Sequence, residues 1–206
     1  MKKNVIALVF ATVVLMFSSQ LSAQDISVAV GVKVGTSLSN YRLGGHMKDF
    51  KSKMNIGGLL GGFAKYELST NFALQSSIDL YYKTSDMEYK ADKLSDKYKY
   101  WGAEMPLYGI FQVKLGSGKG FIGTGPYLGY GISAKSDGVN LFKKNNETQK
   151  AIMKRLDFGI GGIIGFDFDK NWQINASYQF GLTDQHKAKG GSMKSQSLAI
   201  GLIYKF

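Results

Sequence analysis

The sequence contains no cysteine, and no long apolar run follows residue 23. The lack of cysteine excludes a disulfide framework, a thiolate nucleophile, a cysteine-based metal site and the acylated anchor of a lipoprotein. The lack of apolar runs means that the mature chain cannot cross a membrane as helices, so a closed barrel is the remaining way to span one. Glycine occurs 26 times and aromatic residues make up 13% of the chain, which favours a single all-β domain.

The first 23 residues have the organisation of a signal peptide. Lys2 and Lys3 are a basic start, residues 5–17 are apolar, and residues 21–23 (LSA) form a cleavage site. The apolar part is shorter than the ~20 residues of a spanning helix, which argues against a helical anchor. We therefore expect a signal peptide at 1–23 and a mature domain at 24–206.

The mature chain alternates between bulky apolar residues and small or polar residues with a period of two. This period indicates β-strands. Eight segments show it, and an even number is what a simple antiparallel barrel needs. The predicted fold is an all-β, eight-stranded antiparallel up-and-down transmembrane β-barrel with strands near 28–40, 54–68, 72–83, 100–115, 120–134, 156–168, 172–183 and 195–206.

The connections between these segments alternate between short and long. Short turns are expected at 69–71, 116–119 and 169–171, and long polar loops at 41–53, 84–99, 135–155 and 184–194. Every second connection of an up-and-down barrel lies at the same end, so one end should carry turns and the other loops. Outer-membrane barrels have this layout, with turns in the periplasm and loops outside the cell.

A soluble barrel of the lipocalin type would show the same alternation with its apolar face inside. The opposite face here is rich in Gly, Ser, Gln and Asn and carries few charges, which favours a narrow lumen over a solvated outer surface. Aromatic residues also fall near the strand ends, where the two membrane interfaces would lie. They are Phe72, Tyr82, Trp101, Trp172, Tyr204 and Phe206.

Charge is concentrated in the four predicted loops. They hold 17 basic and 8 acidic residues, an excess of nine, and the mature chain as a whole has the same excess. Most of the remaining charges fall on the predicted lumen face, at Lys33, Lys65, Glu67, Asp79, Lys83, Glu104, Lys114, Asp157, Asp167 and Lys205.

An eight-stranded barrel is about wide enough for its own side chains, and buried charges must pair. We therefore expect a lumen filled by ion pairs, with a network of Lys33, Asp79, Lys83 and Glu104. A conducting ion path is the alternative.

Several segments resemble a known family. They are residues 31–40 (GVKVGTSLSN), 66–75 (YELSTNFALQ), 105–107 (MPL), 125–130 (GPYLGY) and 203–206 (IYKF). In this order they are similar to the PorT-like outer-membrane β-barrel family of the Bacteroidota, and the resemblance spans nearly the whole mature chain. It implies an outer-membrane location and recognition of the terminal Phe206 by the barrel-assembly machinery. It implies no particular function, because fold does not fix function.

The basic loops suggest a surface-binding role. A secreted protein does not meet nucleic acid, whereas phosphorylated lipopolysaccharide is anionic and lies at the level of the loops. The candidate residues for binding anionic lipid headgroups are Arg42, Lys48, Lys51, Lys53, Lys143, Lys144, Lys154 and Arg155, although solvated loop charges would look the same.

The other functions considered are a narrow channel for small solutes and, third, a rim enzyme acting on lipid A or peptides. His46 and His186 are the only histidines, and no catalytic or metal-ligand spacing surrounds them. Residues 57–62 (GGLLGG) lack the helix and lysine of a phosphate-binding loop. We therefore predict a non-enzymatic barrel with a structural or surface-binding role, without cofactor or metal. Its partners would be outer-membrane lipids and an unidentified protein if it belongs to a secretion apparatus.

Overall fold

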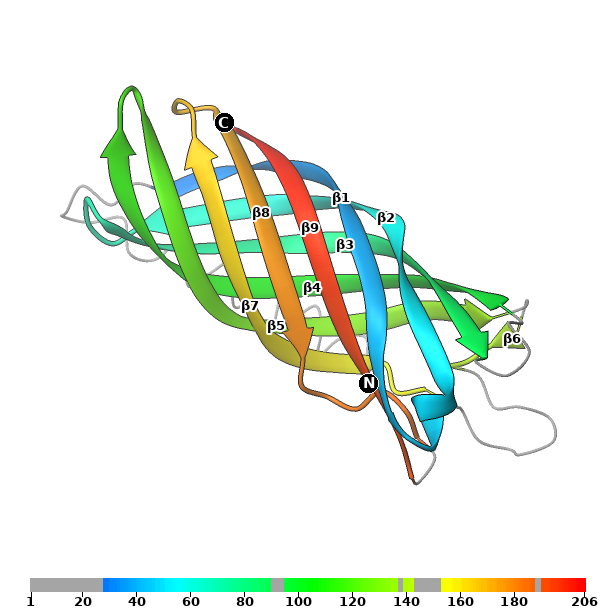
Figure 1. The fold of residues 1–206 in the computed structure, drawn as a ribbon. Coiled ribbons are helices and arrows are strands. Elements are labelled where there is room, and N and C mark those ends of the chain that lie inside the picture. Colours follow the sequence, from blue (N-terminus) through cyan, green and yellow to red (C-terminus); the bar gives the residue numbers. More distant parts are fainter. Residues whose placement is uncertain (1–27, 90–94, 137–138, 143–152, 188–189) are drawn as a thin grey trace, which may run out of the picture.

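The computed structural model describes residues 28–89, 95–136, 139–142, 153–187 and 190–206 (Figure 1). The predicted signal peptide lies outside the described residues and stays a prediction. No helix within the described part of the chain is long and apolar enough to cross a membrane.

The described chain forms a closed antiparallel barrel of eight strands. Neighbouring strands pair in the order β4-β3-β2-β1-β9-β8-β7-β5, and pairing of β4 with β5 closes the ring. A two-residue strand, β6, pairs only with β5 above the barrel. The strands are β1 Val28–Gly45, β2 Phe50–Glu67, β3 Phe72–Tyr89, β4 Ser95–Leu115, β5 Gly118–Ser136, β6 Val139–Asn140, β7 Leu156–Asp167, β8 Trp172–Gly181 and β9 Gly191–Lys205. The predicted fold class is confirmed.

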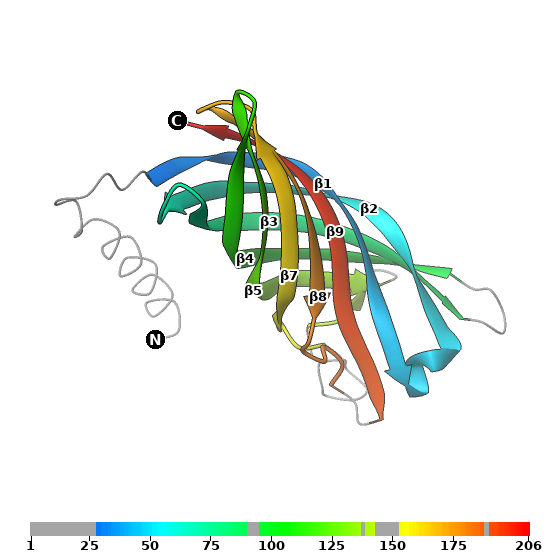
Figure 2. The same ribbon diagram turned by 60° about the vertical axis from the view of Figure 1, so that its left-hand side comes forward.

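The turns and the carboxyl terminus lie at one end of the barrel (Figures 1 and 2). Side chains hold the backbone of these turns. In the β7–β8 turn, Asp169 Oδ1 accepts hydrogen bonds of 2.7 Å from the backbone N–H of both Asn171 and Trp172. These two bonds favour the ionised carboxylate and lower the pKa of Asp169.

The strands run further at the opposite end than the sequence pattern predicted. The loop expected at 41–53 is reduced to the 3-10 helix η1 His46–Asp49 between β1 and β2, and the β3–β4 ladder extends to the pair Glu88 and Ser95. The prediction was too short because the outward face becomes polar there, which ends the apolar alternation while backbone pairing continues. The barrel wall therefore rises above its apolar part, most of all on β1 to β4 and on β9.

The outward face carries an apolar belt. Its side chains occupy every second position from 28 to 38 on β1, 72 to 82 on β3 and 122 to 132 on β5, interrupted only by Thr36, Ser76 and Thr124, and most of them are exposed. Each stretch matches the ~9–11 residues that a tilted strand needs to cross a bilayer. The predicted aromatic residues meet in pairs at the two edges of the belt. Tyr82 and Trp101 have ring centroids 4.8 Å apart at one edge, and Trp172 and Tyr204 have centroids 5.0 Å apart at the other.

Candidate functional site: the lumen and the lipid-facing wall

The lumen near the short turns contains an ionic layer shared by three strands. Asp167 on β7 accepts hydrogen bonds of 2.6 Å from Lys65 on β2 and from Lys205 on β9. Beside it, Lys119 Nζ donates to Glu67 Oε1 at 2.9 Å. Lys65, Asp167 and Lys205 are buried, so this layer fills the lumen with satisfied charges rather than leaving them to solvent.

A second ionic layer lies nearer the loop end of the lumen, which is called the upper end here. Its residues belong to one row of register partners on successive strands. The row runs across six strands through Lys33, Gly61, Asp79, Glu104, Gly129 and Asp157. A Cβ atom at Gly61 would lie 2.3 Å from Asp79 Oδ1, so the glycine provides room for the carboxylate. Lys33 Nζ donates to Asp79 Oδ2 at 2.8 Å, and Lys83, two inward positions above Asp79, is ion-paired with Glu104.

Asp157 differs from the other carboxylates of this layer because its partners are hydroxyl groups. Ser195 Oγ donates to Asp157 Oδ2, and Tyr127 Oη lies 3.2 Å from the same oxygen. All the carboxylates of the row are buried, with Asp157 only 2% exposed. Among the described residues Asp157 has no ion-pair partner.

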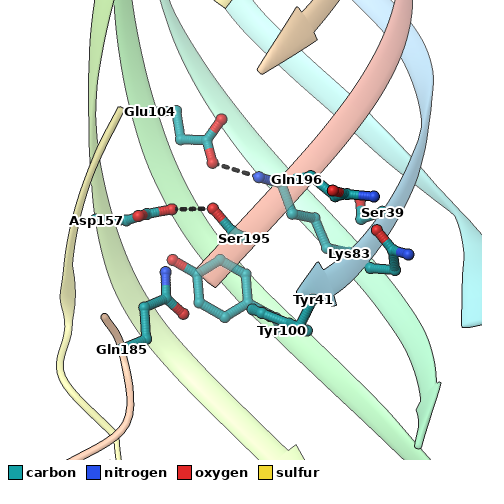
Figure 3. A pocket seen from close by; sticks show the side chains of 10 residues that line it. Ser39, Tyr41, Lys83, Tyr100, Glu104, Asp157, Gln185, Ser195 and Gln196 are labelled. Carbon is teal, nitrogen blue, oxygen red and sulfur yellow. Dashed lines mark hydrogen bonds and ion pairs between the residues drawn. The ribbon is translucent and has the colours of Figure 1, made fainter. Parts of the chain in front are cut away.

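An apolar and aromatic cap closes the lumen above this layer. Tyr41 and Tyr98 pack edge to face with centroids 5.2 Å apart, and Tyr98 Oη donates to Met153 Sδ at 3.2 Å. A cavity of about 10 Å³ remains between the cap and the ionic layer (Figure 3). The buried cap residues are Tyr41, Tyr98, Tyr100, Ala134, Phe142, Met153 and Met193.

The structure thus places Lys33, Asp79, Lys83 and Glu104 in one layer, as two ion pairs. Within the expected network, Lys33 reaches Asp79 across Gly61, and Lys83 pairs with Glu104. Lys114, which was expected inside, is exposed near the short β4–β5 turn. The position of a charge along its strand therefore decides whether it belongs to the packed lumen.

Two of the predicted lipid-binding residues are held by the barrel itself. The Arg42 guanidinium lies 3.4 Å from the centroid of the Phe180 ring and donates to the carbonyl of Gly181 at 2.8 Å. Arg155 donates to the carbonyls of Gly131 and Ile132 at 2.8 and 2.9 Å. Arg42 reaches from β1 across β9 to β8, whereas Arg155 joins the start of β7 to its neighbour β5.

The other predicted binding residues divide into three groups. Lys53 is paired with Glu88, with 2.6 Å between Nζ and Oε2. Lys48, Lys51 and Lys154 are exposed. Lys143 and Lys144 lie outside the described residues.

Three exposed lysines form a further basic surface, here called the cationic strip: Lys99 on β4, Lys135 on β5 and Lys154 just before β7. Lys99 and Lys135 are register partners and occupy the outward face. Lys99 is the next outward position above Trp101. Only Lys154 was named as a binding residue from the sequence; the other two could have been found by continuing the alternation upward from Trp101.

His46 and His186 lie at the loop end, and Asp184 organises the chain between β8 and β9. Its Oδ1 accepts hydrogen bonds from the backbone N–H of Met193 at 2.9 Å and of His186 at 3.0 Å. Burial raises the pKa of Asp184, but these bonds, together with the charge of Lys154 and a hydrogen bond with Ser192, outweigh it and the pKa is lowered. Within the described segments, no group of three or more His, Cys, Asp or Glu residues could hold a metal ion.

A closed eight-stranded barrel with an apolar belt and aromatic edges defines the class of transmembrane barrels. The profile of the family described as outer membrane protein beta-barrel domain matches residues 18–187, and the chain belongs to this family. The protein is therefore localised in the outer membrane. The finer PorT-like assignment stays a prediction. No match is found among curated protein sequences.

Solved structures of outer-membrane barrels are similar to this chain. OprG from Pseudomonas aeruginosa is 14% identical, with a TM-score of 0.51, and the match covers 89% of this chain and 96% of OprG. Neisserial surface protein A is 16% identical with a TM-score of 0.47, covering 87% and 99% of the two chains. Ail of Yersinia pestis is 15% identical with a TM-score of 0.44, covering 86% and 98%. At this identity the similarity to OprG establishes the fold alone.

Proposed function

We propose that this protein is a non-enzymatic, closed outer-membrane barrel that binds the phosphate groups of outer-leaflet lipids through the cationic strip. The observation that carries the proposal is the register pair of Lys99 and Lys135 on the outward face. Both side chains are exposed, and neither has an ion-pair partner within the part of the chain that the structure describes.

Two like charges directly opposite each other on neighbouring strands destabilise a sheet. Their Cβ atoms are ~4.5–5.5 Å apart, so one phosphate group can contact both ammonium groups. A carboxylate lies on the same outward face of β3, at Asp86, one outward position beyond Thr84, the register partner of Lys99. In the described structure it accepts a hydrogen bond of 3.1 Å from Asn55 and forms no ion pair with either lysine. An external anion is therefore the natural partner of the lysine pair.

The height of the cationic strip supports a lipid as the source of this phosphate. Trp101 and Tyr82 pack together at the upper edge of the belt, and aromatic residues of barrels lie at the level of the headgroups. Lys99 follows directly above Trp101, where the first phosphates of the outer leaflet are expected. Lys154, just before the neighbouring strand β7, is a third exposed lysine at this end of the barrel.

The filled lumen supports a surface role over a channel. Two ionic layers and the aromatic cap occupy the interior, and the cavity between the upper layer and the cap is about 10 Å³. A solute path would have to displace buried ion pairs.

The test is the double variant Lys99→Gln/Lys135→Gln, compared with the parent for binding of lipid A in vesicles. A lysine near an anionic membrane surface contributes ~1 kcal/mol, so losing two should weaken binding by about 2 kcal/mol, roughly 30-fold. The difference should shrink at high salt, because exposed charges are screened over ~8 Å at physiological ionic strength.

The matched control is Lys48→Gln/Lys51→Gln, which removes the same charge from exposed positions on η1 and β2. It should bind lipid A nearly as the parent does, and dephosphorylated lipid A should not distinguish the variants. Equal loss of binding in both double variants would contradict the proposal. It would show that the positive charges at the loop end act together without a specific phosphate site.

A further inference from the structure

The structure assigns a binding site for a single monovalent metal cation, of the size of Na⁺ or K⁺, to the small cavity between the upper ionic layer and the aromatic cap. Glu104, Asp157 and Gln185 provide its oxygen ligands. This site goes beyond the lipid-binding role, because it lies inside the barrel and does not depend on the cationic strip.

The first argument is a local excess of negative charge. The upper layer contains three buried carboxylates, Asp79, Glu104 and Asp157, and two buried lysines, Lys33 and Lys83. Each lysine is paired with one carboxylate, which leaves Asp157 with hydroxyl partners only. A buried carboxylate without a cation is costly even when hydroxyl groups bond it.

The balancing positive charge in the lumen is far away. It lies in the lower layer, where Lys65 and Lys205 share Asp167. Asp157 and Asp167 are ten positions apart on β7, which corresponds to ~33 Å along the strand. At that distance the lower layer cannot compensate Asp157.

The second argument comes from the oxygens that line the cavity (Figure 3). Glu104 Oε2 and Asp157 Oδ1 are buried and have no hydrogen-bond partner among the described residues. Gln185, which is not acidic and is 2% exposed, adds an equally unpartnered Oε1 to the same cavity. Lys83 and Ser195 also line the cavity, but their donors are already bonded to Glu104 Oε1 and Asp157 Oδ2. The three unpartnered oxygens are acceptors, so they favour a cation or a further donor.

The register explains why the two carboxylates converge. Glu104 and Asp157 flank Gly129 on adjacent strands, all facing the lumen. A Cβ atom at Gly129 would lie 3.3 Å from Glu104 Cγ and 3.4 Å from Asp157 Cβ. Because Gly129 has no side chain, the side chains of Glu104 and Asp157 can approach each other across it.

Cavity size and charge select the occupant. A volume of about 10 Å³ holds about one water-sized particle. Mg²⁺ usually keeps several of its waters and Ca²⁺ takes 6–8 oxygen ligands, so neither matches this space, and either would overcompensate a single excess charge. A water molecule would leave the charge uncompensated. A proton would serve one oxygen and leave the others without a partner.

The test measures heat unfolding of the refolded, detergent-solubilised protein in NaCl, KCl and choline chloride at equal ionic strength. We expect a higher unfolding midpoint in NaCl or KCl than in choline chloride, because a ligand that binds only the folded state stabilises it. Asp157→Asn should abolish the difference by removing the excess charge. The control Asp49→Asn, at an exposed position of η1, should retain it.

Equilibrium binding of radioactive Na⁺ gives a second readout that does not depend on stability. The parent protein should show one saturable Na⁺ site. If Asp157→Asn fails to fold, Gln185→Leu replaces it as the test variant, because it changes no charge and should still weaken Na⁺ binding. Equal midpoints in all three salts, or a midpoint that rises from pH 7 to pH 5 regardless of the salt, would overturn the cation assignment. The second result would mean that a proton occupies the site.

Discussion

Individual lumen charges show how far a sequence pattern reaches at the residue scale. The period of two placed Lys33, Asp79, Lys83 and Glu104 on the inner face, because inward and outward positions alternate along any strand. The pattern could not choose their partners. The pairing of Lys33 with Asp79 requires the register of three strands, with Gly61 between them, and that register is a property of the closed barrel.

Breaking the Lys33–Asp79 pair should destabilise the barrel strongly. Lys33→Met leaves Asp79, which is fully buried, without its cation, and the loss of one partner of a buried pair costs about 3–5 kcal/mol. The matched change Lys53→Met breaks an ion pair in which 63% of the lysine side chain is exposed, and should cost about 0–1 kcal/mol. Urea unfolding in detergent compares the two, and equal losses would show that the lumen pair is not stabilising.

At the scale of elements, strand ends were predicted well near the short turns and less well at the loop end. Strand starts near the short turns were predicted closely, because apolar residues continue to the end of the belt there. At the loop end, Lys99 and Lys135 were assigned to loops although both lie on paired strands. The chemistry of the outward face changes at the membrane surface while the backbone ladder does not, so hydropathy locates the membrane rather than the strand end.

The β8–β9 connection should be ordered by Asp184 in a pH-dependent way. The pKa of this carboxyl is lowered in the folded protein, so its stabilising effect is present above the unfolded pKa of ~3.9 and is lost as the pH falls through the folded pKa. We expect the Met193 amide to be protected from hydrogen exchange at pH 7 and less so near pH 3. Asp184→Asn should lower this protection at pH 7 and change little near pH 3; a constant difference between the two proteins would contradict the role.

The whole molecule is a barrel whose interior is filled by side chains and whose outer wall faces the membrane lipids. Global features were predictable from the sequence: the number of strands, the alternation of turns and loops, and the excess of nine positive charges in the predicted loops. The aromatic cap was not, because Tyr41, Tyr98 and Phe142 come from segments distant in the sequence that only barrel closure brings together. Both ionic layers and the cap occupy the lumen, so a solute path would have to displace buried ion pairs.

Conductance across a planar bilayer tests this closed-lumen account most directly. Purified parent protein, inserted from detergent at physiological salt, should add no steady current to that of the bare bilayer, because a permeating ion would have to disrupt Lys33–Asp79, Lys83–Glu104 and the cap. A stable, ohmic current step for each inserted barrel would contradict the account and make the protein a channel.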